Sequence, residues 1–227
     1  MMPEASTPVD TERLIDAILH DVRTPLAAAT GYLRLLREGR VSAGEQSEHV
    51  LEQAQASLRS IAVLCANADV CRRTDVVPRR NSVAATRIVD GLIGAIVTHD
   101  VTPDSAELPP NATVQICGDW SELCHLLGHA LGVLARPRKN DNAGRVYIDG
   151  EQGVFRATAS LPLRPGNMPR SAFDPWVYPG LTVAAGLHAL GLAGGRWAFN
   201  EDDRTLCVEL EMVTSSYVES PEERATR

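Results

Sequence analysis

Apolar residues recur at intervals of three and four along two stretches near the start of the chain. The first stretch runs from Asp10, which can cap a helix, to Gly39, which can end one. Its apolar positions are Leu14, Ile15, Ile18, Leu19, Val22, Leu26, Ala29, Leu33 and Leu36. This spacing predicts a long helix with one buried stripe that includes Leu19, Val22 and Leu26.

The second stretch, residues 45–73, has the same spacing and follows a short connector. Its apolar positions are Val50, Leu51, Ala54, Leu58, Ile61, Leu64, Cys65 and Ala68, in steps that resemble a coiled-coil seam. Two long helices joined by a short connector form an antiparallel hairpin. One hairpin cannot cover its own apolar stripe. We therefore expect two copies to pair as a homodimer whose hairpins form a four-helix bundle.

Further along the chain the pattern changes to that of a mixed α/β domain. Helical spacing predicts helices at residues 83–98, 121–135 and 181–192. Alternation predicts strands at residues 113–117, 145–148, 154–159, 196–200 and 206–212. The expected fold class is α + α/β, a helical hairpin followed by a small α/β sandwich. The expected divisions are a disordered leader at 1–9, a hairpin domain at 10–74, a linker at 75–82, an α/β domain at 83–213 and a flexible tail at 214–227.

Composition and charge exclude several classes of protein. The net charge of −7 leaves no general basic face, so we expect no nucleic-acid partner. No apolar run approaches the roughly 18 residues that a membrane span needs, and the first ten residues lack the pattern of a secretory signal. The five cysteines include no Cys-x-x-Cys pair, as is usual for reduced thiols. These observations predict a soluble, cytoplasmic protein with no membrane span.

The candidate chemistry lies in the first helix, in the segment His20-Asp21-Val22-Arg23-Thr24-Pro25-Leu26. A neutral imidazole nitrogen of His20 is a good nucleophile toward phosphorus, and Asp21 can fix its tautomer and act as general base. Thr24 lies one turn further on the same face, where its hydroxyl could position a water for the hydrolytic reaction. Pro25 removes a helix hydrogen bond, and Arg23 can offset phosphate charge or meet an acidic partner.

Residues 18–26, Ile-Leu-His-Asp-Val-Arg-Thr-Pro-Leu, followed by Gly31-Tyr32-Leu33, resemble the phosphoacceptor box of two-component sensor histidine kinases. In that family the box lies on the first helix of a dimeric hairpin domain, and an ATP-binding α/β domain follows. The resemblance covers roughly residues 10–213. It implies that His20 carries a phosphoryl group, that Asp21 and Thr24 assist it, and that Arg23 and Pro25 meet a response-regulator receiver domain.

The second half departs from the family where ATP chemistry needs specific residues. The family's first nucleotide box reads Asn-Leu-Leu-x-Asn-Ala, and the matching segment here has His125 and His129 in place of both asparagines. Imidazole is a softer ligand than the oxygen donors that magnesium prefers. The family's first glycine box, Asp-x-Gly-x-Gly, should follow the strand at 154–159, but residues 160–166 read Ser-Leu-Pro-Leu-Arg-Pro-Gly.

Other parts of the nucleotide site still resemble the family. Phe173-Asp174-Pro175-Trp176 is similar to its phenylalanine box, and the segment that begins at Gly180 lines up with its second glycine box. We therefore expect a degenerate ATP-binding domain in which His125, His129 and Gly180 line a vestigial pocket. Zinc binding by His125 and His129, with Cys124 or Glu122 nearby, is an alternative, but the sequence offers no obvious third ligand, so we expect no metal site.

Three functions remain open. The first is histidine phosphotransfer, in which His20 exchanges a phosphoryl group with the aspartates of response regulators. That reaction requires no cofactor of this chain, because the regulator brings its own magnesium. The second is an ATP-dependent autokinase that binds ATP through divergent residues. The third is a non-catalytic scaffold for regulators, or a phosphatase that acts through Thr24.

Overall fold

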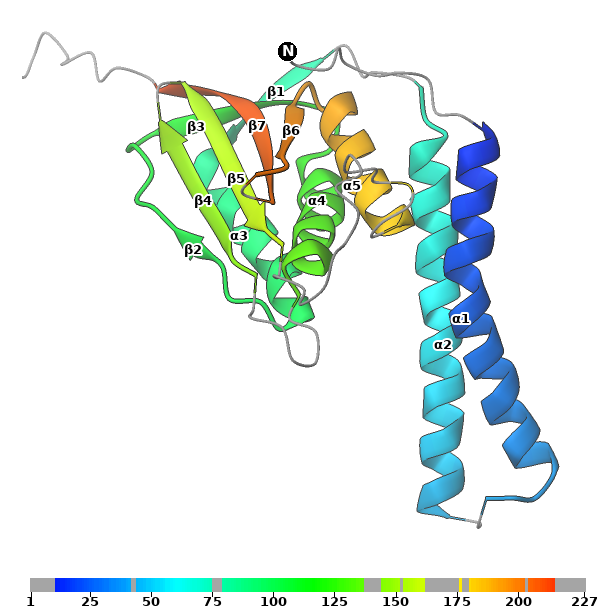
Figure 1. Ribbon diagram of the computed structural model, residues 1–227. Coiled ribbons are helices and arrows are strands. Elements are labelled where there is room, and N and C mark those ends of the chain that lie inside the picture. Colours follow the sequence, from blue (N-terminus) through cyan, green and yellow to red (C-terminus); the bar gives the residue numbers. More distant parts are fainter. Residues whose placement is uncertain are drawn as a thin grey trace, which may run out of the picture.

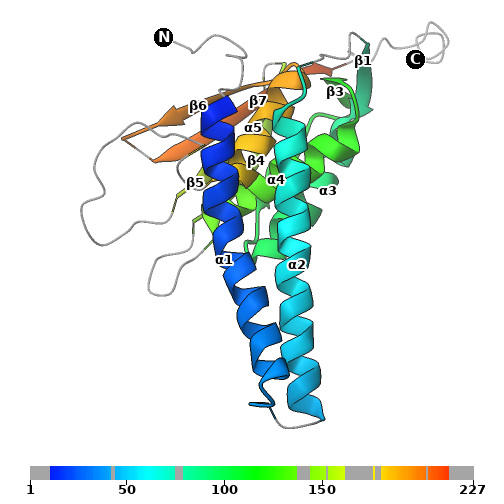
Figure 2. The ribbon, with the colours of Figure 1, turned by 90° about the vertical axis from the view of Figure 1, so that its right-hand side faces the viewer.

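The computed structural model describes residues 11–41, 44–74, 79–136, 144–151, 153–161, 176, 180–202 and 204–214. The described residues form a long helical hairpin with a mixed α/β domain packed against one end of it (Figures 1 and 2). The predicted leader, most of the predicted tail and part of the linker lie outside these residues. The fold class therefore agrees with the prediction from the hydrophobic pattern.

The hairpin consists of α1 (Thr11–Arg37) and α2 (Glu45–Cys71), which lie side by side (Figure 2). Small side chains dominate where the two helices are most tightly packed. Ala17 and Ala29 of α1 and Ala54 of α2 are all buried. Alanine lets two helix backbones approach closely, and it costs little conformational entropy to order. Small residues thus form much of the buried contact between α1 and α2.

The prediction that Leu19 and Leu26 lie in the buried stripe is wrong for the single chain. Their exposed fractions are 63% and 52%. The apolar positions form two lines on each helix, and only one of these lines can face the other helix of the same hairpin. The large apolar side chains that the hairpin leaves exposed are Ile15, Leu19, Leu26, Leu33, Leu51, Leu58 and Val63.

Seven strands of the described chain form one sheet with the order β1-β3-β7-β5-β4-β2, and β6 also pairs with β7. Their bounds are β1 Arg80–Ala84, β2 Asp104–Ser105, β3 Ala112–Cys117, β4 Val146–Glu151, β5 Val154–Ser160, β6 Arg196–Asn200 and β7 Thr205–Thr214. Only β2 and β4 are parallel among the pairs, and the other pairs are antiparallel. The long strand β7 joins the sheet together, because it pairs with β3, β5 and β6.

The predicted linker at 75–82 is wrong at its end, since residues 80–84 form β1. This strand lies at the edge of the sheet and pairs antiparallel with β3, from Arg80 opposite Cys117 to Ala84 opposite Thr113. Only Val83 of β1 is buried. An edge strand with one buried side chain lacks the alternating pattern by which strands are found in a sequence.

Three helices cover one face of the sheet (Figure 1): α3 (Ala85–Ile96), α4 (Trp120–Ala135) and α5 (Leu181–Leu192). A short 3₁₀ turn, η1 (Val97–His99), extends α3. Asp119 caps α4, because its side chain accepts a hydrogen bond from the N–H of Ser121 at 2.8 Å.

Helix α5 is apolar on all sides because it contributes to two separate cores. Val183, Leu187 and Leu190 belong to the core between the helices and the sheet. Leu181, Ala184 and Ala185 belong to a second, smaller core with Leu14 of α1 and with Ala68 and Cys71 of α2. A helix without a polar face must be covered on every side. α5 therefore lies between the sheet domain and the hairpin (Figure 1).

Polar contacts surround this second core. The buried side chain of Asn67 donates from Nδ2 to Thr182 Oγ1 at 3.3 Å. His188 donates from Nε2 to the carbonyl oxygen of Arg73 at 2.7 Å. The guanidinium of Arg73 also binds both carboxylate oxygens of Glu122, at 2.7 and 2.8 Å. These contacts fix the rotation of the α/β domain about the end of the hairpin.

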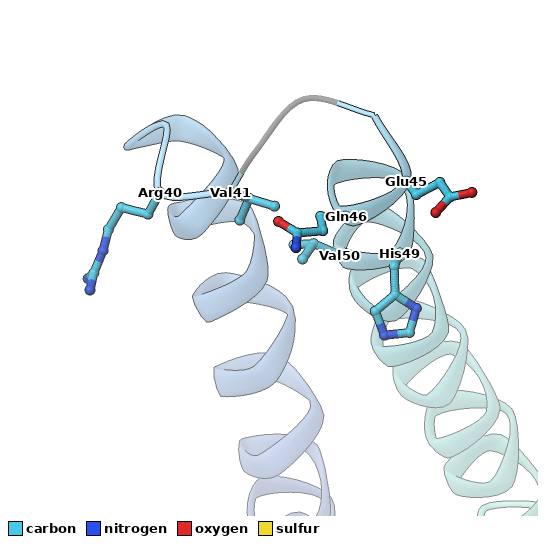
Figure 3. Close-up of a pocket in the computed structure, with 6 residues that line it drawn as sticks. All are labelled: Arg40, Val41, Glu45, Gln46, His49 and Val50. Atoms are coloured by element: carbon cyan, nitrogen blue, oxygen red, sulfur yellow. The ribbon is translucent and has the colours of Figure 1, made fainter.

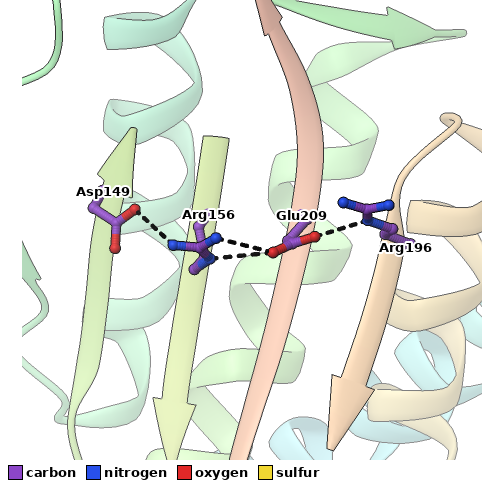
Figure 4. Close-up of polar contacts among 4 residues, drawn as sticks. All are labelled: Asp149, Arg156, Arg196 and Glu209. Carbon is purple, nitrogen blue, oxygen red and sulfur yellow. Dashed lines mark hydrogen bonds and ion pairs between the residues drawn. The ribbon is translucent and has the colours of Figure 1, made fainter. Parts of the chain in front are cut away.

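The face of the sheet away from the helices carries a row of charges of alternating sign (Figure 4). Asp149, Arg156, Glu209 and Arg196 lie opposite one another on β4, β5, β7 and β6. Glu209 accepts from Arg156 at 3.1 Å and from Arg196 at 2.7 Å. Burial alone would raise the pKa of Glu209, but the two guanidiniums outweigh it and lower this pKa.

We predict that Gly186→Ala destabilises the fold. A Cβ at residue 186 would lie 2.6 Å from the Cβ of Ala130 and 2.8 Å from the carbonyl oxygen of Leu126. Helices α4 and α5 would have to separate, at a cost of about 1–3 kcal/mol in the free energy of unfolding. Urea unfolding measures this. Gly191→Ala is the matched control, because a Cβ there meets nothing within 4 Å, and we expect it to be neutral or to stabilise by up to about 1 kcal/mol. Equal effects of the two substitutions would contradict the close packing.

We predict that Glu209→Gln lowers the free energy of unfolding by about 1–2 kcal/mol near neutral pH, because it removes a charge that two arginines share. Since folding lowers the pKa of Glu209 below 4.5, the stabilisation is complete above that value and is lost as the pH falls through the lowered pKa. Urea titrations at several pH values should show that the free energies of unfolding of the wild type and of Glu209→Gln become equal in acid. Glu201→Gln, in an exposed turn, is the control. A difference that stays constant into strong acid would contradict this account.

Candidate functional site

His20 lies on the exposed side of α1, near the end of the hairpin that contacts the α/β domain. Its side chain is 82% exposed. Nδ1 is 2.9 Å from Oδ1 of Asp21. A carboxylate only accepts hydrogen bonds, so Nδ1 carries the proton and the lone pair of a neutral ring lies on Nε2. The ring therefore presents a nucleophilic nitrogen to solvent, as the chemistry proposed from the sequence requires.

Asp21 is held from two sides. Its Oδ1 faces His20, and its Oδ2 accepts a hydrogen bond from the backbone N–H of Leu181 at 2.8 Å. Leu181 is the first residue of α5, and its side chain is fully buried. The side chain of Asp21 is only 18% exposed, in contrast to that of His20. One carboxylate therefore connects His20 of the hairpin to a helix of the α/β domain.

The other predicted residues of this segment are placed around His20. Arg23 and Thr24 are exposed and lie three and four residues further along, so both are neighbours of His20 on the helix surface. Pro25 is half-buried inside α1. Because proline has no N–H, the carbonyl of Asp21 has no hydrogen-bond partner four residues ahead. The helix is thus weakened next to His20.

The contact between Asp21 and Leu181 was not predicted from the sequence. Sequence analysis assigns Gly180 to a nucleotide pocket, whereas in the structure Gly180 lies against Asp21. Its φ is +100°, and a Cβ there would lie 2.5 Å from Oδ2 of Asp21. A glycine directly before a helix indicates a turn or a close approach. Nothing in the sequence identifies which of the distant residues approaches it.

His125 and His129 lie together on α4 and line a hollow of about 360 Å³ that faces α3. His129 Nδ1 is 2.8 Å from Nε2 of His99, a residue that sequence analysis did not single out. Burial lowers the pKa of both His99 and His129. Gly180 does not line this hollow. The three residues predicted to share a vestigial pocket therefore lie in two different places, two of them at this hollow and one against Asp21.

The ligands suggested for zinc are engaged elsewhere. Glu122 forms the paired contact with Arg73. Cys124 is buried, its Sγ points to the carbonyl of Ile88 at 3.7 Å, and burial raises its pKa to about 12. No group of three or more histidine, cysteine, aspartate or glutamate side chains within the described residues is arranged to hold a metal ion.

The described residues do not fit the family's magnesium-nucleotide site. His125 and His129 offer nitrogens where magnesium prefers oxygens, and the ring of His129 is paired with His99. The space beside Gly180 is taken by the carboxylate of Asp21. The segment in place of the first glycine box lies largely outside the described residues, as do Phe173, Asp174 and Pro175. Trp176, the last residue of the phenylalanine-box match, packs against the core shared with the hairpin.

A second hollow, of about 400 Å³, lies at the far end of the hairpin, between Arg40 and Val41 of the connector and the first turns of α2. Figure 3 shows Arg40 and Glu45 on opposite sides of it and pointing away from each other. Arg40 lies twenty positions after His20, most of them helical, which corresponds to roughly 30 Å along the helix axis. This hollow is therefore separate from the histidine site.

None of the helices in the described ranges combines the length and the apolar character needed to cross a membrane.

Residues 10–69 match the His Kinase A (phospho-acceptor) domain family. No protein of curated function matches the sequence. Among solved structures, the chain is similar to the histidine kinase AdeS of Acinetobacter baumannii, with 16% identity, a TM-score of 0.57, and coverage of 86% of this chain and 98% of that one. It is also similar to full-length ShkA in complex with AMPPNP, with 18% identity and a TM-score of 0.50, covering 91% of this chain and 47% of that one.

A structure described as a bacterial phosphotransferase overlaps with 91% of this chain and all of its own, at 18% identity, but its TM-score of 0.45 is too low to bear on the fold. The likeness to the two kinases shows that the hairpin and the α/β domain have the histidine kinase fold. The phospho-acceptor match covers the hairpin and includes His20 and Asp21. Residues 10–69 are therefore similar to the His Kinase A (phospho-acceptor) domain, and the chain has the histidine kinase fold.

Proposed function

We propose that this protein is a histidine phosphotransferase whose His20 exchanges a phosphoryl group with the phospho-aspartate of a response-regulator receiver domain. The observation that carries the proposal is the state of the His20 ring. Its Nδ1 is held by Asp21, and its Nε2 is free on an exposed surface. A receiver domain can approach such a nitrogen directly.

The transfer step follows from this geometry. The lone pair of Nε2 attacks phosphorus, an N–P bond forms, and the P–O bond to the receiver's aspartate breaks, which leaves that aspartate as a carboxylate. The ring becomes positively charged because Nδ1 keeps its proton. The carboxylate of Asp21, 2.9 Å away, stabilises that charge. The reverse step passes the group to a second receiver.

Two features favour a receiver over ATP as the phosphoryl donor. His125 and His129, which replace the family's two asparagines, offer no oxygen ligand for magnesium. Gly180, which would approach a phosphate of ATP, approaches Asp21 instead. Phosphoryl transfer from ATP depends on such positioning and charge stabilisation. A receiver domain supplies its own magnesium and acidic pocket, so this chain then needs neither.

We assign supporting roles to the residues around His20. Arg23 is exposed three residues along from His20, where its guanidinium can meet the acidic pocket of a receiver. Pro25 is half-buried in the next turn and weakens the helix beside His20, and we assign it to the contact with the receiver as well. Thr24, one turn from His20, can orient a water for hydrolysis.

We further propose that two copies pair through the hairpins. Leu19, Leu26 and Leu33 are separated by seven residues each and are roughly half exposed or more. Leu51 and Leu58 of α2 have the same separation and similar exposure. A seven-residue repeat is the spacing of helices that pack along a common seam. A second hairpin would cover these side chains as a four-helix bundle.

The transfer is tested with radiolabelled receiver domains from the same organism as donors. We expect acid-labile label on the wild-type protein and none on His20→Ala, since no other residue of the chain replaces the nucleophile. Asp21→Asn should slow transfer by at least about tenfold, because the charge that stabilises the phosphorylated ring is lost.

Radiolabelled ATP with magnesium is the parallel donor in that experiment. Label from ATP on the wild type and none on His20→Ala would make the protein an autokinase and would contradict the proposal. Failure of all receivers and of ATP to label His20 would favour the scaffold function.

Dimer formation is tested with Leu33→Glu. Each copy would bury an unpaired carboxylate in the bundle, so we expect the dimer dissociation constant to rise at least about a hundredfold. Sedimentation equilibrium measures it. Val97→Glu is the matched control, since Val97 is 47% exposed and lies on the α/β domain. A wild-type monomer, or a Leu33→Glu dimer of wild-type affinity, would contradict the predicted bundle.

A further inference from the structure

We propose that the start of α5 positions Asp21 and so determines which nitrogen of His20 is free to react. In this proposal Gly180 and Leu181 are positioning residues that act on the histidine through a single carboxylate. The α/β domain then controls the phosphoacceptor without a nucleotide. The proposal rests on the assignment of His20 as phosphoacceptor, and it deepens that assignment by naming what regulates the site.

The first argument is the geometry of neighbouring residues on a helix. Successive side chains project about 100° apart around a helix, so residues i and i+1 do not ordinarily face each other. His20 and Asp21 nevertheless lie within hydrogen-bonding distance, 2.9 Å between Nδ1 and Oδ1. The other oxygen of the same carboxylate is bound by the N–H of Leu181 at 2.8 Å. The hydrogen bond from Leu181 keeps Asp21 in the orientation that its contact with His20 requires.

The second argument is the fit of Gly180. A Cβ at this position would lie 2.5 Å from Oδ2 and 3.0 Å from Oδ1 of Asp21. Its φ of +100° is also strained for any residue with a side chain. The carboxylate can therefore reach the N–H of Leu181 only because residue 180 has no side chain.

The third argument is that the contact belongs to a packed interface. Leu181 is fully buried in the core that α5 shares with the hairpin. One residue further along, Thr182 accepts a hydrogen bond from the buried Asn67 of α2. The contact also places a carboxylate at the N-terminus of a twelve-residue helix, where the helix dipole favours negative charge. Docking of α5 on the hairpin and capture of Asp21 thus occur together.

The consequence concerns the histidine. While α5 is docked, Asp21 receives the Nδ1 proton and Nε2 keeps its lone pair. If α5 moves away, the carboxylate of Asp21 becomes exposed to water, and no other side chain of the described residues holds the proton of His20 on Nδ1. The fraction of the ring with a free Nε2 then falls, and so does the rate of phosphorylation. A signal that separates the two domains would thereby reduce phosphotransfer.

The test uses the full chain labelled with ¹⁵N-histidine, with the His20 signals assigned by comparison with His20→Ala. Long-range ¹H–¹⁵N spectra report which ring nitrogen is protonated. We expect the Nδ1–H tautomer in the wild type and a shift toward Nε2–H in Gly180→Ala. Gly191→Ala, at an exposed site on the same helix, should resemble the wild type. A wild-type tautomer in folded Gly180→Ala would overturn the proposal.

A second variant covers the case in which Gly180→Ala does not fold. In Asp21→Asn, the amide oxygen can still accept from Leu181, which turns the amide N–H groups toward His20. The ring must then accept at Nδ1, so we expect the Nε2–H tautomer with the interface intact. An unchanged Nδ1–H tautomer in this variant would also overturn the proposal.

The effect on the reaction is measured with phosphoramidate, a small donor that transfers its phosphoryl group to histidine and releases ammonia. Mass spectrometry of the intact protein over time gives the rate of phosphorylation. We expect Gly180→Ala to react more slowly than Gly191→Ala, on the order of fivefold, as for loss of one hydrogen bond. Equal rates would overturn the link to reactivity. Gly180→Ala could shift the tautomer while neither phosphoramidate nor any receiver labels His20 in any of these proteins. That result would support the positioning role and overturn the proposed function.

Discussion

Helix α5 has no polar side, and the rest of the structure depends on how it is covered. One side packs on α4 and the sheet, where Gly186 allows the helix backbones to approach closely. The other side packs on the ends of α1 and α2 through Leu181, Ala184 and Ala185. Leaving either side in water would expose a continuous apolar surface. The two domains are therefore held together by a helix that neither could bury alone.

This constraint brings the start of α5 to the segment of α1 that contains His20 and Asp21. The N–H of Leu181 would be an unpaired donor at the first turn of a helix, and Asp21 of α1 satisfies it. The same carboxylate holds the proton of His20 on Nδ1. A hydrogen bond that completes the end of a helix thus also leaves Nε2 as the free nitrogen of His20. In this chain, the packing between domains and the chemistry proposed for His20 depend on one side chain.

The second half of the chain also contributes contacts that hold the structure together. Its sheet and helices retain the histidine kinase fold, and the row of charges across β4, β5, β7 and β6 secures the outer face of the sheet. The positions aligned with nucleotide boxes instead make contacts within the protein. His129 pairs with His99, and Gly180 approaches Asp21. A domain with these contacts can serve to hold and orient the hairpin, which is the role that the proposed phosphotransferase needs.

The sequence by itself determined the elements whose signals are local. Helical spacing located α1 and α2, and alternation located β5 and β7, because each pattern repeats within a few residues. The adjacent His20 and Asp21 suggested the chemistry that is proposed here. Only the tertiary structure decided the rest. Edge strand β1 has one buried side chain, so its pairing with β3 leaves no periodic pattern. Whether Leu19 faces its own hairpin or lies outside depends on how the helices pack. The partner of Gly180 lies about 160 positions away in the sequence, and a contact of that kind is set by the docking of whole domains.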